Sequence, residues 1–93
     1  MENEPIFSTR DLYLATSLVS MGFFMLNIDM VHEGHKNQAV GYFKFSDTPE
    51  LQDARSRYMQ GLLLVEPKMF VTNLKSLKSE VVNANQNPHG FGR

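Results

Sequence analysis

The sequence predicts a small single α+β domain with the element order α-β-β-α-β-α, in which an antiparallel hairpin is extended by a third strand and the helices lie mostly on one face. Three observations support this prediction. Apolar residues recur at helical spacing between Ser8 and Gly22. Two stretches rich in strand formers, 23–31 and 39–45, follow on either side of a polar segment. Ser46-Asp-Thr-Pro-Glu50 then contains the residue types that begin a helix.

We place the first helix at residues 9–21. Ser8 can serve as its N-cap, since a serine hydroxyl can accept a hydrogen bond from an amide of the first turn. Phe7 and Leu12 then occupy the two positions of a hydrophobic staple. Gly22 can adopt the left-handed conformation that commonly ends a helix.

The two predicted strands each alternate between two faces. In the first strand, the face directed at the core consists of Phe24, Leu26, Ile28 and Met30. In the second strand, the core face consists of Ala39, Gly41, Phe43 and Phe45, and the opposite face of Val40, Tyr42 and Lys44.

The second helix begins at Pro49 with Thr48 as its cap and ends at Gly61. Its inward side chains are expected to be Leu51, Ala54, Tyr58 and Met59. The apolar run Leu62–Val65 is too short for a helix and predicts the third strand. A third amphipathic helix runs from Met69 to about Ala84.

These elements predict one shared hydrophobic core. Its expected members are Leu12, Leu18, Leu26, Ile28, Phe43, Phe45, Leu51, Phe70, Leu74 and Leu77. Residues 1–6 and 85–93 lack apolar periodicity, so we expect a flexible N-terminus, a domain over residues 7–84 and a flexible tail.

Composition excludes several classes of protein. The 93 residues include no cysteine, which rules out a disulfide framework and thiolate chemistry. No apolar run approaches the roughly 20 residues that a membrane helix needs. The formal net charge is −1, which provides no general attraction to nucleic-acid phosphates. Acidic residues outnumber basic ones in residues 1–66, and basic residues outnumber acidic ones in residues 67–93. A mildly basic C-terminal helix of this kind is usually an ordinary solvated helix face.

The sequence contains no pattern typical of catalysis, cofactor binding or metal binding. His32-Glu-Gly-His35 lacks the spacing of a metalloprotease motif and lies in a predicted hairpin loop. Asp47, Glu50 and Asp53 stand at a helix start, where the helix dipole alone favours carboxylates. The glycines form no phosphate-binding loop. We therefore expect no catalytic, cofactor or metal residues and a protein that is not an enzyme.

Gly41-Tyr-Phe-Lys-Phe45 resembles the aromatic strand of an RNA-recognition motif, which stacks bases on exposed sheet aromatics. Val40 stands where that motif has a basic residue, and Lys44 stands where it has a second aromatic. The simpler alternative is a hairpin whose aromatics belong to the core. On the nucleic-acid interpretation, Tyr42 and Lys44 are the contacting residues.

The run Leu62–Val65 also suggests self-association. Two of its side chains can face the core, and the other two must be covered by a helix, by the tail or by another chain. We expect Phe23, Met25, Leu62 and Leu64 to contribute to a homodimer interface.

Several segments together resemble a family of short bacterial and phage domains of unknown function. They are Phe7-Ser-Thr-Arg-Asp-Leu-Tyr-Leu-Ala15, Gly22-Phe23, Val40-Gly-Tyr-Phe-Lys-Phe-Ser-Asp-Thr-Pro-Glu-Leu51, and Gly61 with Val65-Glu-Pro-Lys-Met-Phe70 and Leu74-Lys-Ser-Leu77. The resemblance implies a phage or mobile-element setting and a non-enzymatic role, and it transfers no catalytic residue.

The expected function is therefore a small protein-interaction or assembly module that binds itself or another protein. A single-stranded nucleic-acid-binding accessory protein and a minor phage structural component are the alternatives. The expected location is the cytoplasm of a bacterial or phage-infected cell, with the virion as the alternative and no membrane association.

Overall fold

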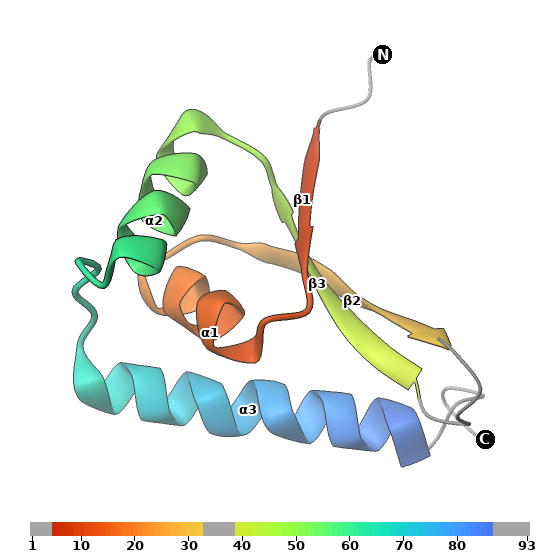
Figure 1. Ribbon diagram of the computed structural model, residues 1–93. Coiled ribbons are helices and arrows are strands. Elements are labelled where there is room, and N and C mark those ends of the chain that lie inside the picture. The colour runs from red at the N-terminus through yellow and green to blue at the C-terminus, as the bar shows by residue number, and fades with distance from the viewer. Residues whose placement is uncertain (1–4, 33–38, 87–93) are drawn as a thin grey trace.

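The computed structural model describes residues 5–32 and 39–86. Within them the chain forms β1 (Ile6–Thr9), α1 (Leu12–Ser20), β2 (Met25–His32), β3 (Ala39–Ser46), α2 (Pro49–Gln60) and α3 (Pro67–Gln86). The strands form one antiparallel sheet in the order β1-β3-β2 (Figure 1). The α+β class is confirmed, whereas the predicted element order was wrong: the observed order is β-α-β-β-α-α.

The first difference is at the start of the chain. Ile6–Thr9 forms a strand beside β3, with Phe7 opposite Phe45 and Thr9 opposite Phe43. Ser8 therefore lies in a strand and does not cap α1. Asp11 is the cap, because its Oδ1 accepts hydrogen bonds from the amides of Tyr13 at 3.0 Å and Leu14 at 3.1 Å.

This shift also removes the predicted hydrophobic staple. In a helix capped by Asp11 the staple positions are occupied by Arg10 and Ala15. Phe7 instead packs against the core from β1.

The end of α1 agrees with the prediction. Gly22 has a φ of 103°, in the region that favours glycine. Its amide donates to Val19 O at 3.0 Å, and the amide of Phe23 donates to Leu18 O at 3.0 Å. These two bonds form a Schellman motif, which reverses the chain immediately after the helix.

The buried face of β2 differs from strict alternation because the strand contains a β-bulge. Met25 pairs with Phe45 and Asn27 with Lys44, which leaves Leu26 as the extra residue. Met25 and Ile28 therefore both face the core. Leu26 is 42% exposed and Phe24, before the strand, is 77% exposed, so the prediction that these two are buried was wrong.

The predicted core face of β3 is confirmed. Gly41, Phe43 and Phe45 are buried on it. At Gly41 a Cβ atom would lie 3.3 Å from Ile28 Cγ2 and 3.4 Å from Val81 Cγ2. The lack of a side chain at Gly41 thus allows α3 to pack closely over this part of the sheet.

The predicted start and end of α2 are also confirmed. Thr48 Oγ1 accepts from the amide of Leu51 at 3.1 Å, Pro49 is the first helical residue, and Gly61 ends the helix with a φ of 75°. Leu51 and Ala54 are buried. Met59, which was expected to point inward, is 67% exposed.

Leu62–Val65 is not a strand, so the third strand predicted there was wrong. The segment links α2 to α3 with alternating exposure: Leu63 and Val65 are half-buried and Leu62 and Leu64 are exposed. The place beside β3 that a third strand would take is held by β1. Glu66 then caps α3, since its carboxylate accepts from the amides of Lys68 and Met69.

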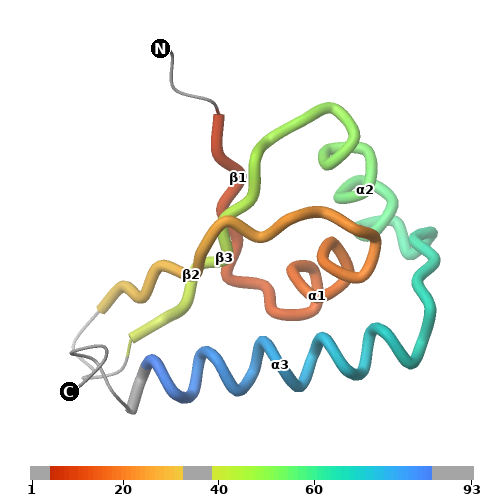
Figure 2. Tube along the Cα trace, turned by 180° about the vertical axis from the view of Figure 1, so that it is seen from behind, coloured from red at the N-terminus to blue at the C-terminus, as the bar shows by residue number. Residues whose placement is uncertain are grey.

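The core forms where α1 meets the sheet, α2 and α3 (Figure 2). Of the predicted core residues, Leu18, Phe43, Phe45, Leu51 and Leu77 are buried, and Leu12, Ile28, Phe70 and Leu74 are half-buried. Five consecutive residues of α1, Leu14–Leu18, are buried. Two of them are polar, and their hydroxyls are satisfied within the helix: Thr16 donates to Leu12 O at 2.8 Å and Ser17 donates to Tyr13 O at 2.9 Å.

We predict that Asp11→Ala lowers the free energy of unfolding by about 0.5–2 kcal/mol, because two amides of the first turn lose their acceptor. Ser8→Ala is the control and should change stability by less than about 0.5 kcal/mol, since Ser8 is an exposed strand residue. Urea unfolding of the two variants measures the difference. A larger loss for Ser8→Ala than for Asp11→Ala would contradict the observed cap.

We also predict that Gly41→Val costs about 1–3 kcal/mol through overpacking against α3 and β2. The same substitution should cost less when Val81→Ala makes room for it, since the two positions touch. A double-mutant cycle in urea measures this coupling. Equal costs in the two backgrounds would show that α3 does not pack on Gly41.

Candidate interaction surface

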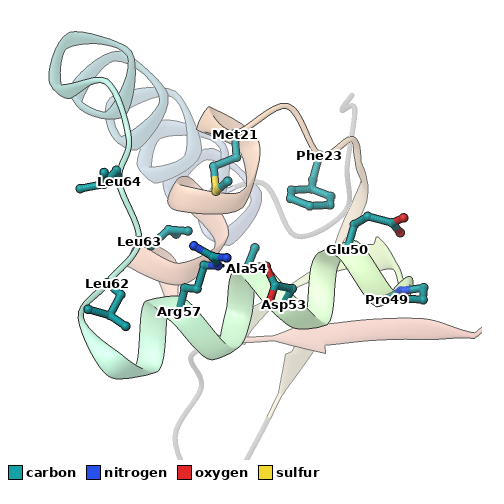
Figure 3. Close-up of a pocket in the computed structure, with 10 residues that line it drawn as sticks. All are labelled: Met21, Phe23, Pro49, Glu50, Asp53, Ala54, Arg57, Leu62, Leu63 and Leu64. Atoms are coloured by element: carbon teal, nitrogen blue, oxygen red, sulfur yellow. Dashed lines mark hydrogen bonds and ion pairs between the residues drawn. The ribbon is translucent and has the colours of Figure 1, made fainter.

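An open groove of about 600 Å³ lies beside α2. Its walls come from α2, from the turn after α1, and from the segment that follows α2 (Figure 3). The lining residues are Met21, Phe23, Pro49, Glu50, Asp53, Ala54, Arg57, Leu62, Leu63 and Leu64.

Two chain reversals build the groove. The Schellman turn at Gly22 directs Met21 and Phe23 along one wall. A second turn of the same kind at Gly61, closed by the amide of Leu62 donating to Arg57 O at 2.8 Å, brings the following leucines back beside α2. The groove is therefore a consequence of where two helices end.

The wall formed by the segment after α2 is strongly apolar and exposed. Leu62 is 60% exposed and Leu64 is 88% exposed, whereas Leu63 between them packs against the core. Met21 on the opposite wall is also exposed. Exposed apolar side chains gathered around a hollow are typical of an interaction site.

The α2 wall carries charges of both signs. Arg57 Nε donates to Asp53 Oδ2 at 3.0 Å, and the two side chains are each more than half exposed. Glu50 lies in the first turn of the same helix, where the helix dipole favours its charge. In Figure 3 the Asp53–Arg57 pair stands between the leucines and Phe23.

Two smaller hollows adjoin the groove at Phe23, which lines all three. Their volumes are about 260 Å³ and about 110 Å³. Phe24 lines both of the smaller hollows and Met25 lines the larger of the two.

The structure thus brings together three of the four residues predicted for self-association. Phe23, Leu62 and Leu64 line the groove, but Met25 does not. Met25 was expected on the outer side of the hairpin and instead packs against the core, because the β-bulge changes its face.

Sequence reasoning missed the contributions of Met21, Ala54 and Arg57 to the groove. The signal that could have located them is the pair of helix-ending glycines, Gly22 and Gly61, whose reversals determine which residues line it.

Tyr42 and Lys44 lie on the same sheet face, the one opposite the buried Phe43 and Phe45. Both side chains are half-buried. Lys44 Nζ lies 3.9 Å from Asp29 Oδ2, so a carboxylate of β2 offsets part of the lysine charge on this face. The two predicted residues therefore lie next to each other, but a negative charge accompanies the positive charge on this face.

Three titratable side chains, Asp11, Tyr58 and Asp47, make hydrogen bonds that connect parts of the fold. The Tyr58 hydroxyl donates to Asp11 Oδ2 at 3.3 Å, which ties α2 to the cap of α1. Burial, together with the neighbouring Asp11 carboxylate, raises the pKa of Tyr58 above its ordinary value. Asp47 accepts from Gln52 Nε2 at 2.8 Å.

Nothing in the described part of the chain gathers three or more histidine, cysteine or acidic side chains in a way that could hold a metal ion. Of the motif that begins at His32, only His32 is described, and it is exposed at the end of β2; residues 33–38 lie outside the described ranges. None of the helices within residues 5–32 and 39–86 has the length and apolar character needed to cross a membrane.

The fold and the groove define a small α+β domain with an exposed apolar surface beside its second helix. Residues 4–83 match the family model described as a domain of unknown function (DUF5659). The chain therefore belongs to the DUF5659 family, which confirms the resemblance to a family of unknown function. Neither a curated protein nor a solved structure matches the chain.

Proposed function

We propose that this domain is a non-catalytic interaction module that associates with a second copy of itself through the groove beside α2. The observation that carries the proposal is the position of Leu62 and Leu64, two exposed leucines that stand next to an apolar hollow on the same surface. A protrusion and a hollow on one surface are what a two-fold interface requires, because each copy offers both to the other.

Burial of this surface would contribute a large free energy for so small a domain. Complete burial of a leucine side chain is worth about 1.5–3 kcal/mol, and a two-fold interface buries each exposed leucine once in each of the two copies. Leu64 is nearly as exposed as a side chain can be, so most of its hydrophobic contribution is still available for association.

A non-catalytic role is supported by the contacts of four of the described carboxylates. Asp11 caps α1, Asp47 binds Gln52, Asp53 pairs with Arg57, and Glu66 caps α3. Groups engaged in caps and exposed ion pairs lack the desolvated environment that acid–base catalysis uses.

The biological setting that we propose follows from the family resemblance. It is assembly in a phage or mobile element, within the cytoplasm of a bacterial or phage-infected cell. A minor structural component of the virion is the alternative, in which the same self-association would operate inside a particle.

We predict that Leu64→Glu dissociates the homodimer, because a buried carboxylate would lack a partner in an apolar interface. Met59→Glu is the matched control, since Met59 is also an exposed apolar residue near the end of α2 but does not line the groove. Sedimentation velocity over a range of concentrations measures both. A wild type that stays monomeric at high micromolar concentration, or equal effects of the two variants, would overturn the proposal.

Single-stranded nucleic-acid binding is the second candidate, and the position of Tyr42 and Lys44 on one face of the sheet, opposite the core, favours it. If a base stacks on Tyr42, Tyr42→Ala should lower affinity by about 1–3 kcal/mol, and Lys44→Ala should reduce the dependence of binding on salt. Fluorescence anisotropy with a labelled oligonucleotide tests this function. The absence of binding at low salt would eliminate it.

A further inference from the structure

We propose that the two copies meet with their α2 helices antiparallel about a two-fold axis, so that Arg57 bridges its own Asp53 and the partner's Asp53. This inference rests on the proposed self-association and adds its orientation and its polar contacts. It assigns Asp53 and Arg57 as the residues that select this orientation.

The orientation follows from the uneven distribution of apolar groups along α2. The protruding leucines stand at the C-terminal end of the helix, and Phe23 lies toward its N-terminal half (Figure 3). An antiparallel arrangement places the leucines of each copy over the Phe23 end of the other groove. A parallel arrangement would place leucines on leucines and leave both hollows unfilled.

The charges on α2 favour the same orientation. An antiparallel pair centred near residue 55 brings position 53 of one copy opposite position 57 of the other. Asp53 and Arg57 are already joined at 3.0 Å within each copy. The dimer would then carry four charges of alternating sign around its axis, whereas a parallel pair would place like charges together.

Arg57 has the chemistry for a double contact. A guanidinium has five N–H donors in a fixed plane, and the contact with Asp53 Oδ2 uses Nε. The side chain is 59% exposed, which leaves its terminal nitrogens accessible to a carboxylate of the partner.

The experiment mixes two charge-reversed variants. Asp53→Arg gives a surface with two cations, and Arg57→Glu gives a surface with two anions. Each variant alone should dimerise about tenfold more weakly than the wild type because like charges then meet across the axis. An equimolar mixture should recover the lost affinity as a heterodimer, and the double variant Asp53→Arg/Arg57→Glu should recover it as a homodimer.

Lys78→Glu and Glu80→Arg form the matched control. They change the net charge by the same amounts, but both residues are exposed on α3 and do not line the groove. Their mixture should show no preference for the heterodimer. This control separates a contact across the interface from general attraction between oppositely charged proteins. Loss of the Asp53–Arg57 pair within one helix cannot produce recovery on mixing.

Native mass spectrometry of the mixtures and sedimentation of each variant provide the measurement. Preferential heterodimer formation by the α2 pair, reduced by added salt, supports the antiparallel arrangement. If Leu64→Glu dissociates the wild-type dimer but the α2 pair shows no heterodimer preference, this orientation is wrong and self-association stands. If the wild type is monomeric, both self-association and the antiparallel orientation are wrong.

Discussion

The pairing of β3 with a strand on each side is the constraint on which the rest of the structure depends. β3 is the central strand, and its core face carries two fully buried phenylalanines, Phe43 and Phe45. β2 pairs with β3 from Ala39 to Phe45 and β1 pairs with it from Phe43 to Ser46, so both edges beside Phe43 and Phe45 are occupied. The three helices then share the remaining core, and Leu62–Val65 is left to connect two of them at the surface.

The groove beside α2 is the surface result of that arrangement. The chain must reverse after α1 to enter β2 and after α2 to reach α3, and glycines with positive φ make both reversals. Each reversal leaves apolar side chains exposed beside it: Met21 and Phe24 after α1, and Leu62 and Leu64 after α2. The exposed leucines and the hollow next to them therefore have one common origin.

This surface differs in kind from the sheet face that carries Tyr42 and Lys44. The groove combines protruding leucines with an ion pair whose two charges can be shared between copies. The sheet face combines an aromatic ring with a lysine whose charge is offset by Asp29. Membership of the DUF5659 family is compatible with a function carried by either surface, and it is the geometry of the groove that favours self-association.

The sequence by itself determined those features that depend on residues close together in the chain. Thr48-Pro49 began a helix, Gly22 and Gly61 ended helices, and the alternation of β3 identified its buried face. Only the tertiary structure decided the rest. Whether Ile6–Thr9 or Leu62–Val65 became the third strand depended on which segment could reach β3, and the β-bulge at Leu26 depended on register with Phe43 and Phe45. Both depend on pairing between residues far apart in the sequence. The free energy of such pairing cannot be read from a short stretch of sequence.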